Sequence, residues 1–292
     1  MSDFIQKRKD RLETFKKTVR KKTMTHAPLD IPDGLFIKCD QCGHALYEKQ
    51  LMANHHVCPF CDFHFRIQAK SRMDLILDQG SFHPLFDDLT SMNPLDMPEY
   101  EAKLAIGKTL SGLNDACLCG VGELVGIRVA IAVLEADFMM GSMGSVLGEA
   151  ITRLIEYADQ HRLPLIIFSA SGGARMQEGI FSLMQMAKTS GALYRFDRNK
   201  GLFISVMTHP TTGGVAASFA SLGDITIAEK SALIGFAGAR VIKQTIQQEL
   251  PVGFQTDLFQ LRHGQVDKVV HRKDMRKTLF RLLSFHQGGK HV

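Results

Sequence analysis

From about residue 101 onward, short apolar runs alternate with segments whose apolar residues recur at helical spacing. Strands are predicted at 116–124 and 127–135, joined by a tight turn at Val125 and Gly126, and a helix follows at 146–160. The same alternation predicts later strands at 163–169, 202–207, 224–229, 232–235 and 267–270, and helices at 101–113, 176–194, 215–220, 239–250, 257–261 and 273–285. Near-continuous apolar strands between helices indicate an α/β domain rather than a sandwich.

Residues 163–222 contain the same pattern twice: an apolar run, a pair of glycines and a helix. One apolar run leads to Gly172 and Gly173 before a helix, and a second leads to Gly213 and Gly214 before a helix of small residues. Paired glycines where a buried strand meets a helix leave backbone N–H groups unpaired and free of side chains, which suits an oxyanion. The alternative interpretation is that each pair is a helix-opening turn that allows close helix packing.

The N-terminal segment is basic, with nine Lys and Arg side chains between Lys7 and Lys22. We interpret it as a solvated helix or tail followed by a proline-containing linker, with contact to nucleic acid or a partner as the alternative. The predicted divisions are this segment at 1–34, a cysteine-containing unit at 35–66, a connecting helix (68–78) and loop (81–98) within 67–100, and the large domain at 101–292.

Four of the six cysteines form two C-x₂-C pairs, Cys39 with Cys42 and Cys58 with Cys61, separated by fifteen residues. Four thiolates at this spacing can converge on a tetrahedral Zn²⁺. They would fill its coordination sphere and leave no position for a catalytic water, so the zinc is expected to be structural. Paired disulfides are disfavoured because no export signal is present. The remaining candidate ligands are interpreted as surface, packing or half-buried residues, namely His44, His55, His56, His64, Cys117 and Cys119.

Composition adds only broad limits. The 292 residues are 45% hydrophobic and carry a net charge of +5, which suits an anionic substrate or partner without requiring nucleic acid. No uninterrupted apolar run approaches the roughly 18 residues of a membrane span, and the charged N-terminus does not have the pattern of a signal peptide. A cytoplasmic location is therefore expected.

Three segments behind the four-cysteine unit carry a resemblance: FSASGGARMQE at 168–178, THPTTGGVAAS at 208–218 and IGFAGARV at 234–241. In this order, over about 35–271, they resemble the β-subunit family of bacterial acetyl-coenzyme A carboxylase carboxyltransferases. The resemblance implies a crotonase-like spiral of strand, strand, helix units with an N-terminal zinc ribbon. It also implies a partner α subunit in an α₂β₂ assembly, a biotin carboxyl carrier protein and a biotin carboxylase. The implied reaction moves a carboxyl group from carboxybiotin to acetyl-CoA and yields malonyl-CoA, the first committed step of fatty acid synthesis.

That reaction develops negative charge on oxygen atoms, which backbone N–H groups in a dry pocket stabilise. We expect Gly213 and Gly214 to donate to the enolate oxygen, helped by the positive end of the following helix, and Gly172 and Gly173 to form the other donor turn. Biotin itself can remove the methyl proton, so no protein base is required.

The rival hypothesis is an enoyl-CoA hydratase or isomerase of the same fold, which would need catalytic carboxylates. The candidates for this role are Glu149, Glu178 and Asp224, and the alternative for each is a structural role.

Contacts to coenzyme A are harder to place from one sequence. Arg175 is expected either to contact the acyl-CoA or to order its loop, and the loop from Gly141 to Gly144 either to line the thioester pocket or to pack. Basic candidates for the phosphates of coenzyme A are Lys230, Arg240 and Lys243. A nucleic-acid-binding zinc ribbon is a second class of function, but it would leave the large domain unexplained, and Phe60, Phe63 and Phe65 are as well explained by packing.

Overall fold

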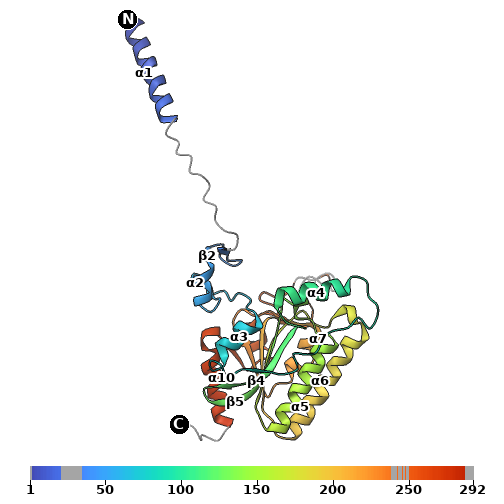
Figure 1. Ribbon diagram of the computed structural model, residues 1–292. Coiled ribbons are helices and arrows are strands. Elements are labelled where there is room, and N and C mark those ends of the chain that lie inside the picture. Colours follow the sequence, from blue (N-terminus) through green and yellow to red (C-terminus); the bar gives the residue numbers. More distant parts are fainter. Residues whose placement is uncertain are drawn as a thin grey trace.

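The computed structural model describes residues 2–20, 35–237 and 250–286, together with positions 242, 245 and 247. The helix predicted at 239–250 and the candidates Arg240 and Lys243 lie largely outside these residues. Helix α1 (Ser2–Arg20) agrees with the predicted basic N-terminal helix and stands apart from the folded body in Figure 1. Among the described residues, no helix is long and apolar enough to span a membrane.

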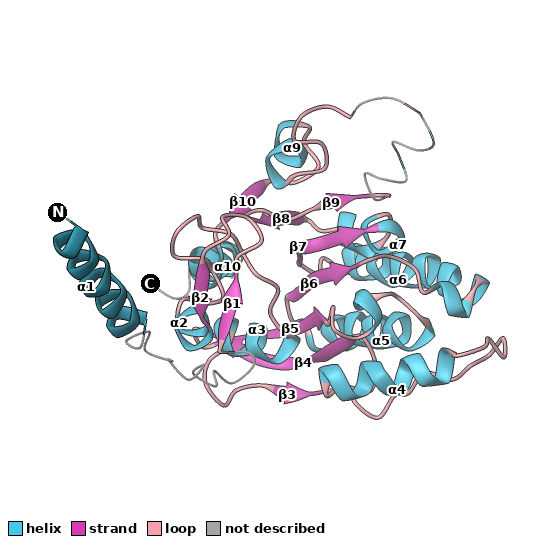
Figure 2. Cartoon of the chain, turned by 90° about the horizontal axis from the view of Figure 1, so that it is seen from above, coloured by secondary structure: helices cyan, strands magenta, loops and turns pink. Residues whose placement is uncertain are grey.

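Within the described residues, one eight-stranded sheet forms the centre of the large domain (Figure 2). Its order is β10-β8-β7-β6-β5-β4-β3, and β9 pairs with β7. Neighbours are antiparallel from β3 to β5 and parallel from β5 onward. The strands are β3 (His83–Pro84), β4 (Cys117–Leu124), β5 (Ile127–Leu134), β6 (Leu165–Ser171), β7 (Phe203–Thr212), β8 (Ile225–Glu229), β9 (Ile234–Gly235) and β10 (Lys268–Val270). Parallel strands end at the same edge, so β6, β7 and β8 bring their carboxyl ends together.

Helices cover both faces of this sheet, which explains why the strands are apolar on both sides. One core contains buried side chains of α4 (Tyr100–Ser111), α5 (Ser145–His161) and α6 (Ile180–Arg198). The other contains those of α3 (Ala69–Ile76) and α10 (Arg272–His286). The short helices α7 (Gly213–Ala216) and α9 (Asp257–Arg262) follow β7 and β9. The predicted α/β class is confirmed.

Element ends differ from the predictions where tertiary contacts intervene. Strand β7 continues five residues beyond 207, because the hydroxyls of Thr208 and Thr211 donate to Ser169 O at 2.9 and 2.8 Å and β9 pairs with its last residues. Helix α6 begins at Ile180 rather than 176, since Gly179 has a φ of +51° and a 3₁₀ turn precedes it. The helix predicted at 215–220 is instead the single turn of α7, followed by a separate 3₁₀ turn at Phe219–Ser221.

The connecting segment packs on the large domain. The helix predicted at 68–78 shares a core with the central sheet. This core contains Met73, Ile76 and Leu77 from the segment and Leu124 and Ile127 from the sheet. The loop predicted at 81–98 contributes β3, which pairs with β4. The connecting segment thus packs on the large sheet, and the predicted domain boundaries stay predictions.

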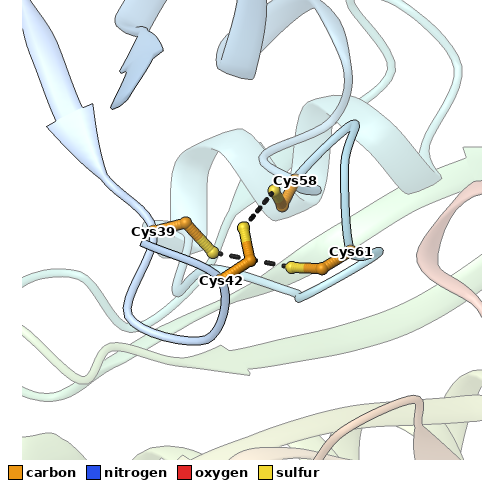
Figure 3. Close-up of side chains that lie close together, drawn as sticks. All are labelled: Cys39, Cys42, Cys58 and Cys61. Atoms are coloured by element: carbon orange, nitrogen blue, oxygen red, sulfur yellow. Dashed lines mark hydrogen bonds between the residues drawn. The ribbon is translucent and has the colours of Figure 1, made fainter. Parts of the chain in front are cut away.

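The four-cysteine unit is built from β1 (Phe36–Lys38), β2 (Ala45–Tyr47) and α2 (Glu48–Ala53) around the two cysteine pairs. All four sulfur atoms converge in Figure 3 and lie within 4.8 Å of one another. The Sγ–Sγ distance is 3.6 Å for Cys39 and Cys61 and 3.8 Å for Cys42 and Cys58. Tetrahedral Zn²⁺ with Zn–S bonds of about 2.3 Å would place its sulfur ligands about 3.8 Å apart. The thiols therefore fit the predicted structural zinc.

Nearby histidines support this unit without joining the sulfur cluster. The imidazole of His44 stacks on Phe60 with ring centroids 4.4 Å apart, and its Nδ1 lies 3.3 Å from Cys42 Sγ. His64 is buried, and its ring meets that of His271 edge to face. Both agree with the packing roles expected of them.

A buried ionic cluster fastens this ribbon to the large domain. Glu229, at the carboxyl end of β8, binds Arg72 of α3 and Arg272 of α10. Arg272 also donates to three ribbon carbonyls: His55 O at 3.0 Å, His56 O at 3.1 Å and Phe65 O at 2.7 Å. Burial alone would raise the pKa of Glu229, but the two arginines and His64 hold it well below its usual value. The ribbon thus sits over the edge where the parallel strands end.

Replacing Cys58 by serine should release the zinc and unfold the ribbon, because three thiolates and a hydroxyl bind Zn²⁺ far more weakly. Metal content and hydrogen exchange over residues 36–66 would measure both effects. Cys117→Ser is the matched control, since Cys117 lies in β4 outside the cluster. Full zinc content in the Cys58 variant would refute the assignment.

Replacing Arg272 by alanine should cost about 3 kcal/mol, because it leaves the buried Glu229 carboxylate short of a partner. Arg276→Ala, on the same helix, removes a partly exposed pair with Asp78 and should cost less than about 1 kcal/mol. Denaturant unfolding gives the stabilities, and hydrogen exchange at 55–66 reports docking of the ribbon. Equal exchange in the two variants would show that the cluster does not hold the ribbon.

Candidate active site

The two glycine turns predicted from the sequence meet backbone to backbone. Gly173 follows β6 and Gly213 follows β7, two neighbouring parallel strands. A Cβ built on Gly173 would lie 3.1 Å from Gly213 Cα, and one built on Gly213 would lie 3.0 Å from Gly173 Cα. Their φ angles are +118° and +59°, in the region that L side chains rarely adopt. Glycine is therefore required at both positions by conformation and by space.

Most of the four predicted donor amides are already engaged. Gly172 N–H donates to Met140 O at 2.8 Å, Gly173 N–H to Ser171 Oγ at 3.0 Å, and Gly213 N–H to Phe236 O at 2.8 Å. The prediction that these three serve as oxyanion donors is corrected by these bonds. Gly173 and Gly213 instead form the contact between the two turns, while Gly172 joins its turn to Met140.

Two neighbouring amides take their place. Among the described residues, neither Ala174 N–H nor Gly214 N–H has an acceptor. A Cβ built on Gly214 would lie 3.2 Å from Ala174 Cβ and 3.4 Å from Ala174 N, so the two residues lie side by side at the junction. Helix α7 has only one turn, so its macrodipole would add little to the binding of an anion at these unpaired N–H groups. Such a pair suits a single anionic oxygen.

Arg175 orders the loop beside this junction. Its side chain is 0% exposed and forms a bidentate pair with Asp115, with N–O distances of 2.8 and 2.9 Å. The same guanidinium donates to Ser142 O at 2.9 Å. Burial alone would lower the pKa of Arg175, but the Asp115 carboxylate more than offsets this and raises it. A side chain without exposed surface cannot contact an acyl-CoA, so of the two roles expected for Arg175 the structure supports ordering of the loop.

Glu178 completes the same buried cluster. Its Oε1 accepts a hydrogen bond from Tyr100 OH at 2.6 Å, and its Oε2 accepts bonds from the N–H and Oγ of Ser145 at 2.6 and 2.5 Å. Burial, partly offset by the charge of Arg175, raises the pKa of Tyr100 to about 12. Glu178 therefore joins the first turn of α5 to α4, and both oxygen atoms of its carboxylate are engaged in this structural network.

The other two candidate carboxylates lie elsewhere. Glu149, on α5, pairs with Arg153 and with Lys188 of α6. Asp224 accepts the N–H of Phe203, at the opposite end of β7 from the glycine turn. The structure thus assigns structural roles to all three carboxylates, and none of them stands at the junction of the turns.

The glycines of the 141–144 loop pack rather than face the site. A Cβ on Gly141, whose φ is +64°, would lie 1.9 Å from Ala170 O, and one on Gly144 would lie 2.4 Å from Glu178 Oε1. Met140 and Ser142, their neighbours in the loop, line the cleft that is described below. Packing is therefore the role of both glycines.

An open cleft of about 970 Å³ lies beside the junction. Gly172 and Ala174 belong to its wall. The remaining lining residues come from the end of the ribbon, α4, the loop and the turn before α6: Arg66, Gln68, Lys103, Ile106, Gly107, Leu110, Ala136, Asp137, Met139, Met140, Ser142, Met176 and Gln177. Mostly apolar walls with a few charged groups are typical of ligand sites.

Lys230, a predicted coenzyme A contact, instead pairs with Asp62 of the ribbon at 2.5 Å and helps to lower the pKa of Asp62 to about 2. Sequence reasoning missed Ala174, Arg66 and Asp115. Ala174 could have been suspected from its place next to the glycine pair. Arg66 and Asp115 carry no signal in the sequence, since each acts through neighbours that are distant along the chain.

Comparison with known proteins identifies the family of the chain. Residues 66–283 match the carboxyl transferase domain, and residues 36–61 match the acetyl-CoA carboxylase zinc finger domain. The chain is 60% identical over 286 residues to the acetyl-coenzyme A carboxylase carboxyl transferase subunit beta of Acholeplasma laidlawii (strain PG-8A), covering 98% of each chain.

Solved structures show the same fold at lower identity. A transcarboxylase 12S structure with methylmalonyl-coenzyme A and methylmalonic acid bound aligns with a TM-score of 0.65 and 23% identity over 82% of this chain, which spans only 44% of that chain. A Pseudomonas malonate decarboxylase hetero-tetramer in complex with malonate aligns with a TM-score of 0.60 and 21% identity, covering 74% and 81% of the two chains.

These neighbours confirm the crotonase-like α/β fold, and the matched zinc finger confirms the ribbon. Because the relative at 60% identity extends over nearly the whole chain, this chain belongs to the family of acetyl-CoA carboxylase carboxyltransferase β subunits.

Proposed function

We propose that this chain provides the acyl-CoA half of a carboxyltransferase site that converts acetyl-CoA to malonyl-CoA. The carboxyl group arrives on biotin, which a separate carrier protein supplies after a biotin carboxylase has charged it. Membership of the family supports the reaction. The observation that carries the site is the pair of acceptor-free amides, Ala174 N–H and Gly214 N–H, beside a mostly apolar cleft.

The amides act on the thioester oxygen. Carboxylation at the methyl carbon of acetyl-CoA requires an enolate, whose negative charge develops on that oxygen. Two N–H groups fixed by the glycine junction stabilise the charge without reorganising, and one such donor typically lowers a barrier by about 3 to 4 kcal/mol. None of the three candidate carboxylates stands at the junction. We therefore expect biotin, rather than a side chain of this protein, to accept the methyl proton.

A partner is expected to close the biotin side of the site. The first turns of α6 present Ile180, Leu183 and Met184 on one exposed stripe, and Met176, in the turn before α6, is 86% exposed beside the cleft. Adjoining exposed apolar side chains mark an interaction surface. We assign this stripe to an α subunit in an α₂β₂ assembly. Contact of basic α1 with nucleic acid would be secondary to this role.

The chemistry of the ribbon bears on the proposed location. Four thiols that must stay reduced to bind zinc favour a reducing compartment. This supports a cytoplasmic site of action.

The test is malonyl-CoA-dependent carboxylation of free biotin, the reverse half-reaction, with this chain alone and with an α subunit. Activity is expected only in the mixture.

Gly214→Ala should lower kcat about 10- to 100-fold, because its methyl group crowds Ala174 and shields the amide pair. Gly191→Ala, in α6 with open space around it, is the control and should keep full activity.

Zinc content and assembly with the α subunit would establish that both variants are folded. Equal kcat for the two glycine variants would remove the amide pair from the mechanism. If the mixture were inactive while this chain alone hydrated crotonyl-CoA, the rival hydratase would replace the carboxyltransferase.

A further inference from the structure

We propose that Arg66, the residue at which the zinc ribbon joins the large domain, binds the phosphate groups of the coenzyme A moiety. The proposal rests on the proposed function and adds a substrate-positioning role for the ribbon. Arg66 lines the cleft together with Lys103 of α4, and the only acidic residue in the described lining is Asp137. The acyl-CoA is a polyanion, so the charge of the cleft is complementary to it.

Arg66 is a cation without a carboxylate partner among the described residues. It is exposed, and its one side-chain contact is a weak one from Nη1 to Met140 Sδ at 3.9 Å. The nearby buried arginines are different: Arg175 is bound to Asp115, and Arg72 and Arg272 to Glu229. Five N–H donors in a planar fork match phosphate oxygens well. The guanidinium therefore has its hydrogen-bonding capacity available to a ligand.

The ribbon fixes the backbone from which this guanidinium extends. Phe65, immediately before it, donates its N–H to His56 O at 2.9 Å and accepts a bond from Arg272 Nη2 at 2.7 Å. Arg66 also lies close enough to His209, near the end of β7, that its charge adds to burial in lowering the pKa of that imidazole. A folded, docked ribbon thus holds a positive charge over the edge that carries the amide pair.

The opposite wall suits the uncharged parts of coenzyme A. Ile106 and Leu110 of α4 are 58% and 61% exposed and line the cleft one helical turn apart. Lys103, one turn before Ile106, is a second cation at the same wall and forms only a loose exposed pair with Glu99 at 3.5 Å. An apolar wall accommodates the pantetheine chain, while cations at both sides hold the phosphates.

The experiment compares two thioesters in the complete complex with the α subunit. Malonyl-CoA carries the phosphates, whereas malonyl-pantetheine has the same thioester without them. Arg66→Met should raise KM for malonyl-CoA about five- to tenfold, with little change in kcat, and leave KM for malonyl-pantetheine unchanged. Arg66→Lys should recover part of the loss, because it keeps the charge and loses the fork.

Lys49→Met is the matched control, since Lys49 is an exposed cation of the ribbon outside the cleft lining. The inhibition constant of free coenzyme A should rise in Arg66→Met and not in the control. Equal increases in KM for both thioesters would place the guanidinium at the acyl group, and no increase for either would leave it without a role in binding. Both of these outcomes overturn the phosphate assignment while the unaltered complex remains active. An unaltered complex inactive on both thioesters would instead overturn the proposed function.

Discussion

The close approach of Gly173 and Gly213 is the constraint on which the candidate site depends. Two parallel strands end side by side, and their following turns touch through backbone atoms, with no side chain between them. This contact brings Ala174 N–H and Gly214 N–H, which have no acceptor among the described residues, close together. Both turns need left-handed backbone conformations, so glycine there provides geometry, while its neighbours provide the chemistry.

Two buried ionic clusters keep that geometry in place. Arg175 links Asp115, Glu178 and the 139–144 loop, and Arg272 links Glu229 to three carbonyls of the ribbon. Removing such charges from water is costly, and a buried pair adds little net stability compared with apolar residues of similar size. What these clusters supply is orientation, because each guanidinium must align with several acceptors from different segments at once. They fix a loop and a small domain around a cleft that a purely apolar contact would position less sharply.

The ribbon is a small unit whose own core is little more than its cysteines and a few apolar side chains. Metal binding replaces the missing core, and binding free energy of this kind is folding free energy. Docking of the ribbon through Arg272 then places Arg66 over the strand ends. Zinc in this arrangement would influence the substrate cleft without touching the substrate, which connects a structural metal to the binding of an anion.

The sequence by itself determined the local parts of this protein. Apolar runs marked the strands, the C-x₂-C spacing marked the zinc ligands, and paired glycines marked the two turns, because each of these signals lies within a few neighbouring residues. Only the tertiary structure decided which amides are free, since the acceptors that engage Gly172 and Gly213 come from Met140 and Phe236. The partner of Arg175 lies 60 positions earlier in the chain, and that of Arg72 lies 157 positions later. Such pairs are selected by packing of distant segments, which residue type and periodicity do not encode locally.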